Sequence, residues 1–168
     1  GTYSRQLPRE NATISEKVRL KKRKAYSNQP AISELKDLMQ YHKLEPIERI
    51  LFCDFDDVSS LRRKDVLDKI PIPSVEWAED LLWSKACLFA GYKIAFCPDS
   101  VVYHSHQPNV LYLFKRGWID QKIAGKYFGA IYYPDLKEVC RAFFKDSYSF
   151  VKELENFEEP FQKKLWAG

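Results

Sequence analysis

The sequence predicts an α/β protein, and two observations point to that class. Apolar and aromatic residues make up 45% of the 168 residues, which is enough to bury a substantial core in one domain. Short β-favouring runs alternate along the chain with segments whose apolar residues recur every three or four positions, as on one face of a helix. Each expected element has its own local signal.

The first third of the chain is expected to hold an extended start, two helices and a buried strand. Residues 1–12 look extended, and the spacing of Thr13 and Glu16 fits a capping box that opens a short basic helix. Apolar residues at helical spacing favour a second helix over residues 32–42. The apolar run 49–55 suits a mostly buried strand.

The rest of the chain is expected to hold a well-defined helix, two strands and aromatic helices. The helix runs from about Ala78 to Gly91, a residue type that often lies just past a helix end. Residues 93–96 and 101–103 are strand candidates, and from Asn109 onward the pattern becomes helical and aromatic.

Charge and cysteine content narrow the functional classes. Residues 1–24 hold eight basic and two acidic side chains, and six of the eight residues 17–24 are cationic. Such a run attracts phosphates, anionic lipid headgroups or nucleic acid, although a solvated helix face is the plainer interpretation. The four cysteines form no C-x-x-C pair, so we expect reduced thiols in a cytoplasmic protein.

The ends of the chain carry no targeting signal that the sequence reveals. No apolar run reaches the roughly 18–20 residues that a membrane-spanning helix needs. The start lacks both an initiator Met and the apolar segment of a signal peptide, which suggests an excised piece of a longer protein.

The acidic pair Glu79 and Asp80 is the first candidate for chemistry. It lies at a helix start, where unpaired amides and the helix dipole favour carboxylates, and first-turn charge complementarity alone explains such a pair. The same position holds a carboxylate rigidly and ionised near neutral pH, as a general base requires.

Histidines and a second acidic pair suggest metal chemistry. His104 and His106 are two apart, so on a strand they would point to opposite faces and at most one would be a ligand; a structural histidine is the alternative. Asp54 and Asp56 imitate the D-x-D pair that binds a divalent cation with a nucleotide diphosphate, but three-residue matches are common by chance.

Six short blocks occur in a fixed order along residues 3–120, namely Arg5–Arg9, Val58–Arg63, Ile70–Pro71, Ala78–Trp83, Ala90–Ile94 and Val101–His106. Taken together, these blocks resemble the C-terminal half of bacterial glycosyltransferase family 2 enzymes, particularly rhamnosyltransferases. The resemblance implies that residues 1–130 are the acceptor-side half of a GT-A sandwich with a small mixed sheet, without the N-terminal nucleotide-binding half. Residues 131–168 would be a helical C-terminal extension.

The resemblance also implies roles for the candidate residues. Asp80 corresponds to the catalytic base of the family's "ED" motif, with Glu79 as its neighbour. The block that ends the second strand corresponds to the place where relatives supply a histidine to the metal, Mg²⁺ or Mn²⁺, that bridges the donor diphosphate. We expect His104 to be that ligand rather than His106.

Three further residues are expected to bind substrate, namely Arg5, Gln6 and Trp83. Arg5 and Gln6 match the family's "GRQLPR" segment, although Ser4 replaces its glycine. The family's own D-x-D lies in the absent half, so the resemblance sets the Asp54 and Asp56 pair aside.

The predicted function is inverting transfer of a sugar, with rhamnose as a candidate, in polysaccharide biosynthesis. The partners would be a nucleotide-sugar donor and a glycan or lipid-linked acceptor, with no nucleic acid, and a homo-oligomer and contact with the inner face of the membrane are further expectations. The chain alone is expected to be inactive. Two alternatives stay open: a noncatalytic interaction module, and a binder of anionic surfaces or nucleic acid through Lys17–Lys24.

Overall fold

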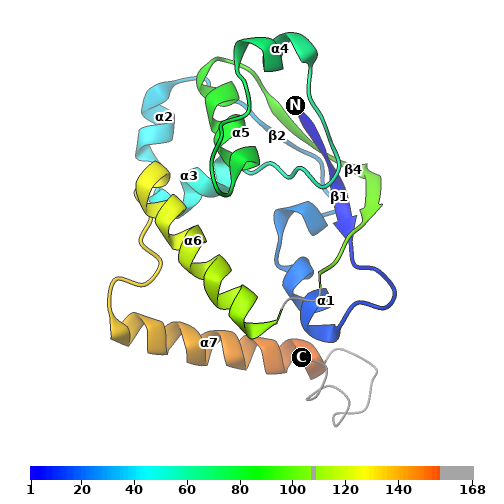
Figure 1. Cartoon of the computed structure of the whole chain (residues 1–168), viewed down its shortest axis with the longest axis vertical. Coiled ribbons are helices and arrows are strands. Elements are labelled where there is room, and N and C mark those ends of the chain that lie inside the picture. Colours follow the sequence, from blue (N-terminus) through cyan, green and yellow to red (C-terminus); the bar gives the residue numbers. More distant parts are fainter. Residues whose placement is uncertain (107–108, 156–168) are drawn as a thin grey trace.

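The computed structural model describes residues 1–106 and 109–155 and has a mixed α/β architecture, a small sheet with helices packed around it (Figure 1). The strands are β1 (Thr2–Leu7), β2 (Ala31–Ser33), β3 (Ser60–Leu61) and β4 (Ile94–Tyr103). They form one four-stranded sheet in the order β2-β4-β1-β3. The central pair β1 and β4 is parallel and both outer pairs are antiparallel, so the expected α/β class with a small mixed sheet is confirmed.

The two strand candidates after residue 92 are in fact one strand. β4 pairs with β1 on both sides of a shift in register, where Ser4 lies opposite Cys97 and Arg5 lies opposite Val101. Pro98 lies in this shifted stretch and has no amide to donate, which suits a bulge rather than a regular ladder. Ser4 Oγ is 2.8 Å from Ser100 Oγ, so the bulge is tied to the neighbouring strand.

Helices make up most of the remaining chain. They are α1 (Ile14–Lys21), the 3₁₀ turn η1 (Lys24–Tyr26), α2 (Leu38–Lys43), α3 (Pro46–Phe52), α4 (Lys64–Lys69), α5 (Glu79–Phe89), α6 (Val110–Phe128) and α7 (Leu136–Glu155). The expected start of α1 is confirmed, because Thr13 Oγ1 accepts a hydrogen bond from the Glu16 amide at 3.2 Å. α5 also lies where the sequence predicts it, and Gly91 beyond it has a φ of +82°.

Two expectations in the first third of the chain are wrong. The run 49–55 is not a strand, because α3 covers Pro46–Phe52. Proline suits the first turn of a helix, and the Glu48 carboxylate accepts a hydrogen bond from the Glu45 amide at 2.9 Å, which closes that turn. The expected helix over residues 32–42 is shortened to α2, because residues 31–33 pair with β4 as β2.

The core lies where α5 meets the sheet. Its most buried members come from α5, β1, β4 and the segment after α3, and include Tyr3, Phe55, Trp83, Leu88, Ile94 and Phe96. Trp83 has no exposed surface, and its indole Nε1 donates a hydrogen bond of 2.8 Å to the Ile70 carbonyl. This bond ties α5 to the end of α4, three residues after the acidic pair.

The two last helices extend away from this core. α6 packs against α3 near its C-terminal end, where Phe128 is buried. α7 lies across the foot of the molecule against α1, and Phe150 packs on Ile14 and Val18 (Figure 1). Within the described residues, no helix combines the length and the apolar character needed to cross a bilayer.

Candidate functional site

The first turn of α5 presents Asp80 in a partly buried position and Glu79 in an exposed one. Ala78, directly before the helix, has a φ of 62° and a ψ of 31°, the left-handed conformation that costs an alanine about 1–2 kcal/mol. Strain of this kind is retained where the surrounding structure imposes it, often at functional sites. Asp80 Oδ1 also accepts a hydrogen bond of 2.7 Å from the Leu81 amide, which holds its carboxyl group in place.

Burial dominates the protonation of Asp80. Burial raises its pKa to about 6, the Leu81 amide opposes this rise, and the charges of Asp56, Glu79 and Asp54 add to it. The helix start therefore does not hold this pKa at its ordinary value, because desolvation outweighs the single amide bond. At pH 7 the ionised form still exceeds the protonated form by about tenfold.

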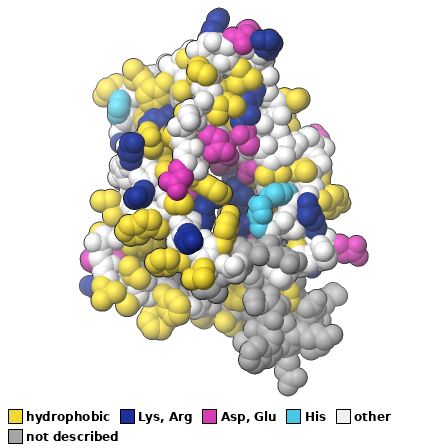
Figure 2. All heavy atoms as spheres, viewed as in Figure 1, with side chains coloured by type: hydrophobic (Ala, Val, Ile, Leu, Met, Phe, Trp, Pro, Cys, Tyr) yellow, Lys and Arg dark blue, Asp and Glu magenta, His cyan; other side chains and the backbone are white. Residues whose placement is uncertain are grey.

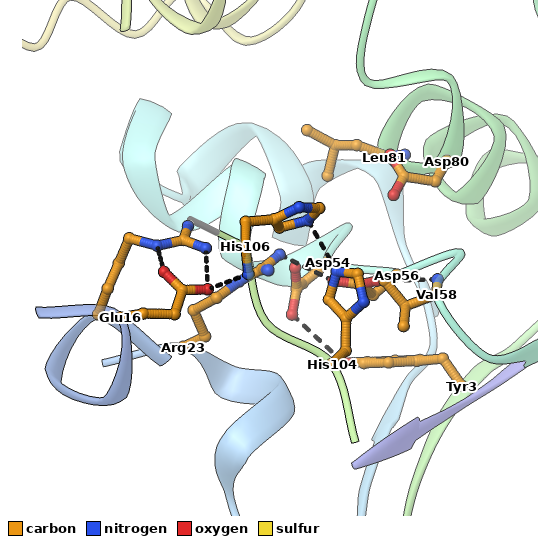
Figure 3. A network of polar contacts seen from close by, with 11 residues as sticks. Tyr3, Glu16, Arg23, Asp54, Asp56, Val58, Asp80, Leu81, His104 and His106 are labelled. Atoms are coloured by element: carbon orange, nitrogen blue, oxygen red, sulfur yellow. Dashed lines mark hydrogen bonds and ion pairs between the residues drawn. The ribbon is translucent and has the colours of Figure 1, made fainter. Parts of the chain in front are cut away.

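The acidic pair that the sequence resemblance sets aside lies beside Asp80. Asp54 and Asp56 follow α3, and in Figure 3 the Asp80 side chain points from α5 toward the space around them. Asp54 Oδ2 accepts a hydrogen bond of 3.3 Å from the Tyr3 hydroxyl, and burial raises the pKa of Asp54. Asp56 Oδ2 is paired with Arg23 Nη2 at 2.8 Å. The negative charges of Asp54 and Asp56 therefore act on Asp80 from a separate segment of the chain.

The two histidines converge, which corrects the expectation that they point to opposite faces. β4 ends at Tyr103, so strand alternation no longer applies, and the Nε2 atoms of His104 and His106 are 2.8 Å apart. The His104 amide donates to the Leu7 carbonyl at 2.8 Å, which continues the pairing with β1 by one residue. Burial and the neighbouring His106 lower the pKa of His104, which favours a neutral imidazole.

The buried carboxylate of Glu16 holds the histidine segment in place. From the sequence, Glu16 is expected only to help start a helix. Glu16 is 1% exposed, and its carboxylate accepts two hydrogen bonds from Arg19, at 2.7 and 2.8 Å. Its Oε1 also accepts a 3.1 Å hydrogen bond from the His106 amide (Figure 3). The capping-box spacing located Glu16 correctly, but a contact with a residue 90 positions later leaves no local signal.

Arg62, which stacks on aromatic rings of the core, is another residue to which the sequence gives no separate role. The guanidinium of Arg62 lies over the rings of Phe55 and Trp83, at 4.9 and 4.8 Å from their centroids, and is paired with Asp57. Burial lowers the pKa of Arg62, and the negative charge of Asp80 is the largest effect opposing that shift. A fixed positive charge therefore acts on the Asp80 region.

The three expected substrate-binding residues have different environments. Arg5 Nε donates to the Tyr26 carbonyl at 3.1 Å, so part of its bonding capacity holds η1. Gln6 is 1% exposed, and neither amide atom has a hydrogen-bond partner among the described residues. Trp83 is fully buried and supports Asp80 from within the core. Substrate contact by these residues stays a prediction.

Two observations limit where a ligand could be held. Among the described residues, no group of three or more His, Cys, Asp or Glu side chains is arranged to hold a metal ion. A cavity of about 360 Å³ lies elsewhere, lined by residues of α2, α3, α5 and the end of α6, and its lining does not include Asp80 or His104. Its Arg49 and Lys85 bind backbone carbonyls near the ends of α2 and α6, which accounts for both cations structurally.

Comparisons of the chain with protein-family models, with curated proteins and with solved structures find no match.

The candidate site combines three carboxylates, two converging imidazoles and flanking arginines. Figure 2 shows acidic and histidine side chains gathered around a hollow in the middle of this face, with basic side chains visible inside it. Such a cluster is suited to moving a proton and to binding a polar ligand.

Proposed function

We propose that this chain is the acceptor-side part of an inverting glycosyltransferase of GT-A type, with Asp80 as the general base. The observation that carries the proposal is the state of Asp80, a carboxyl group with a pKa of about 6 on a strained helix start. A base is most effective when its pKa lies close to the working pH, because it is then both available and strong enough to take a proton. The six sequence blocks that resemble family 2 enzymes supply the reaction class.

In this reaction Asp80 takes the proton of an acceptor hydroxyl on a glycan or lipid-linked saccharide. The hydroxyl oxygen then forms a bond to the anomeric carbon of the donor sugar. The bond from that carbon to the nucleotide diphosphate breaks, and its electron pair leaves with the diphosphate. Attack from the side opposite the leaving group inverts the anomeric configuration. Rhamnose is the candidate sugar because the blocks most resemble rhamnosyltransferases.

The neighbouring residues would tune this base. Asp54 and Asp56 raise the pKa of Asp80 through their negative charges, which strengthens it as a proton acceptor. Arg62, stacked on the core, limits that effect because its positive charge favours the ionised carboxylate. Glu79 is exposed and would influence Asp80 through charge alone.

The proposal includes a divalent metal, Mg²⁺ or Mn²⁺, because the two histidines could supply part of its ligand set. When bound, it would neutralise charge on the departing diphosphate. His104 and His106 offer two imidazole nitrogens that already lie close together, so they fit as part of a ligand set. The remaining ligands would come from the diphosphate and from residues outside this chain.

The domain division follows the same proposal, with an acceptor-side half over residues 1–130 and a helical extension over residues 131–168. The test is to join the chain to a donor-binding half and to measure sugar transfer with a panel of nucleotide-sugars, comparing Asp80→Asn with Glu79→Gln. Transfer that depends on Asp80 supports the enzyme. A fully folded joined protein that transfers no sugar from any donor supports a noncatalytic interaction module instead.

A further inference from the structure

α6 carries a stripe of large apolar side chains that are exposed. Leu111, Phe114 and Trp118 lie at helical spacing on one side and are 72%, 74% and 63% exposed. Lys115 and Lys122 flank this stripe on the same helix and are also exposed. Monomeric soluble proteins rarely leave contiguous apolar patches of this kind open to water.

Further exposed apolar side chains lie in the connection to α7 and along α7 itself. Ile131 and Tyr133 in the connection are 67% and 51% exposed. Along α7 the exposed members are Leu136 (77%), Phe143 (66%), Phe144 (71%) and Tyr148 (71%). We call all of these, together with the α6 stripe, the aromatic surface. Figure 2 shows hydrophobic side chains gathered at the lower left, where Figure 1 places the α6–α7 connection, with basic side chains among them.

The fold also brings the basic run of α1 next to α7. α1 packs against α7, and Lys22 Nζ donates a hydrogen bond of 3.2 Å to Ser149 Oγ. Residues 17–24 hold six cationic side chains, of which Arg19 and Arg23 are paired with Glu16 and Asp56. Residues 109–152 hold eight basic residues against four acidic ones. Two segments more than a hundred residues apart in the sequence therefore combine a cationic strip with exposed aromatic helices.

We infer that the aromatic surface and the basic run of α1 together bind the surface of an anionic phospholipid bilayer. Exposed Trp, Phe and Leu side chains on an amphipathic helix enter the boundary between headgroups and acyl chains. Flanking lysines and arginines then meet anionic headgroups, and each of them adds to the attraction near the membrane surface. The excess of basic residues favours this occupant over an uncharged apolar partner. The inference goes beyond the proposed function and assumes nothing about the chemistry at Asp80.

The test is co-sedimentation of the full chain with phosphatidylcholine vesicles, with and without phosphatidylglycerol. Binding is expected only with the anionic lipid and should weaken as salt increases. The double variants Phe114→Ser/Trp118→Ser and Phe143→Ser/Phe144→Ser should each lower the partition coefficient by about tenfold or more, because each removes two inserted rings. These positions are exposed, so circular dichroism should show an unchanged fold.

Matched controls separate the surface from general effects. Ile32→Ser/Leu61→Ser removes two apolar side chains that are 70% and 77% exposed on β2 and β3, and binding should not change. Lys115→Glu/Lys122→Glu should weaken binding, whereas the same change at the exposed Lys36 and Lys43 should have a much smaller effect. No binding to anionic vesicles, or equal loss from the control variants, overturns the inference. Concentration-dependent self-association that the aromatic variants abolish, without vesicle binding, would assign the surface to a second copy of the chain.

Discussion

The carboxylate of Glu16 accepts a hydrogen bond of 3.1 Å from the backbone amide of His106. The contact joins the first helix to the segment that follows the last strand, and Glu16 is almost completely buried where it does so. Because the same carboxylate is held by Arg19, the histidine segment has one fixed position relative to α1. The orientation of both imidazoles therefore depends on a residue outside the histidine block.

Glu16→Gln should destabilise the fold at neutral pH by roughly 1–3 kcal/mol, because it removes a buried charge from two charge-assisted partners. Burial alone would raise the pKa of Glu16, but the hydrogen bonds from Arg19 and His106 outweigh it and lower that pKa. The stability from this group is therefore present above the ordinary pKa of 4.5 and lost as pH falls below it. Denaturant unfolding at pH 7 and pH 3 should show the difference shrinking in acid. Glu10→Gln, at an exposed position, is the control and should change neither.

The titration of His104 should depend on its neighbour His106. Burial and the neighbouring His106 both lower the pKa of His104. His106→Ala removes that neighbouring positive charge and opens the site to water, so it should raise the pKa of His104. Two-dimensional NMR of the imidazole resonances across pH 5–8 measures the shift. His42→Ala, an exposed histidine on α2, should leave the His104 titration unchanged. A His104 titration that does not move in His106→Ala would contradict the close contact of the two rings.

Asp80→Asn should stabilise the chain above pH 6. A carboxyl group whose folded pKa of about 6 lies above its ordinary 3.8 binds its proton more tightly when folded. Stability is then greatest below pH 3.8 and declines as pH rises through 6, by on the order of 2–3 kcal/mol in total. Asparagine carries no charge, so Asp80→Asn should remove this decline. Unfolding curves from pH 3.5 to 8 test it. Glu79→Gln removes one of the smaller causes of the raised pKa and should keep most of the decline. A less stable Asp80→Asn variant at pH 8 would refute the burial of the charge.

The sequence predicted those parts of the fold that depend on local signals. α5 was correctly placed because its apolar spacing and Gly91 are both local features, and the Thr13 cap is equally local. α3 was mistaken for a strand because seven apolar-rich residues fit a buried strand as well as a short helix. The signal that decides between them, Pro46 with Glu45 and Glu48, lies just before that run.

The candidate site could be predicted only in part. Asp80 was identified because the acidic pair at a helix start belongs to a longer pattern of blocks. The effect of the Asp54 and Asp56 charges on Asp80 leaves no local signal in the sequence, because which loop faces which helix is set by tertiary packing. The convergence of His104 and His106 was missed because it depends on where β4 ends and on Glu16.

The chain by itself should bind nucleotide-sugars no better than millimolar, which corresponds to at most about 4 kcal/mol of binding free energy. In the proposed enzyme the strands that contact the base and ribose belong to a donor-binding half outside these 168 residues. Isothermal titration calorimetry with uridine, guanosine and thymidine diphosphate sugars measures this directly. Micromolar binding of any of them would mean that this chain holds its own donor site.

The most direct measurement of the central claim is kcat for Asp80→Asn in the joined enzyme, with donor and acceptor saturating. Asparagine keeps the shape of the side chain but has no basic oxygen, so kcat should fall by about 10²–10⁴, the range for general-base catalysis. Glu79→Gln should lose much less, because its side chain lies about 100° further around the helix. Retention of nearly full activity by a folded Asp80→Asn enzyme would contradict the account and leave the acidic pair as a helix start.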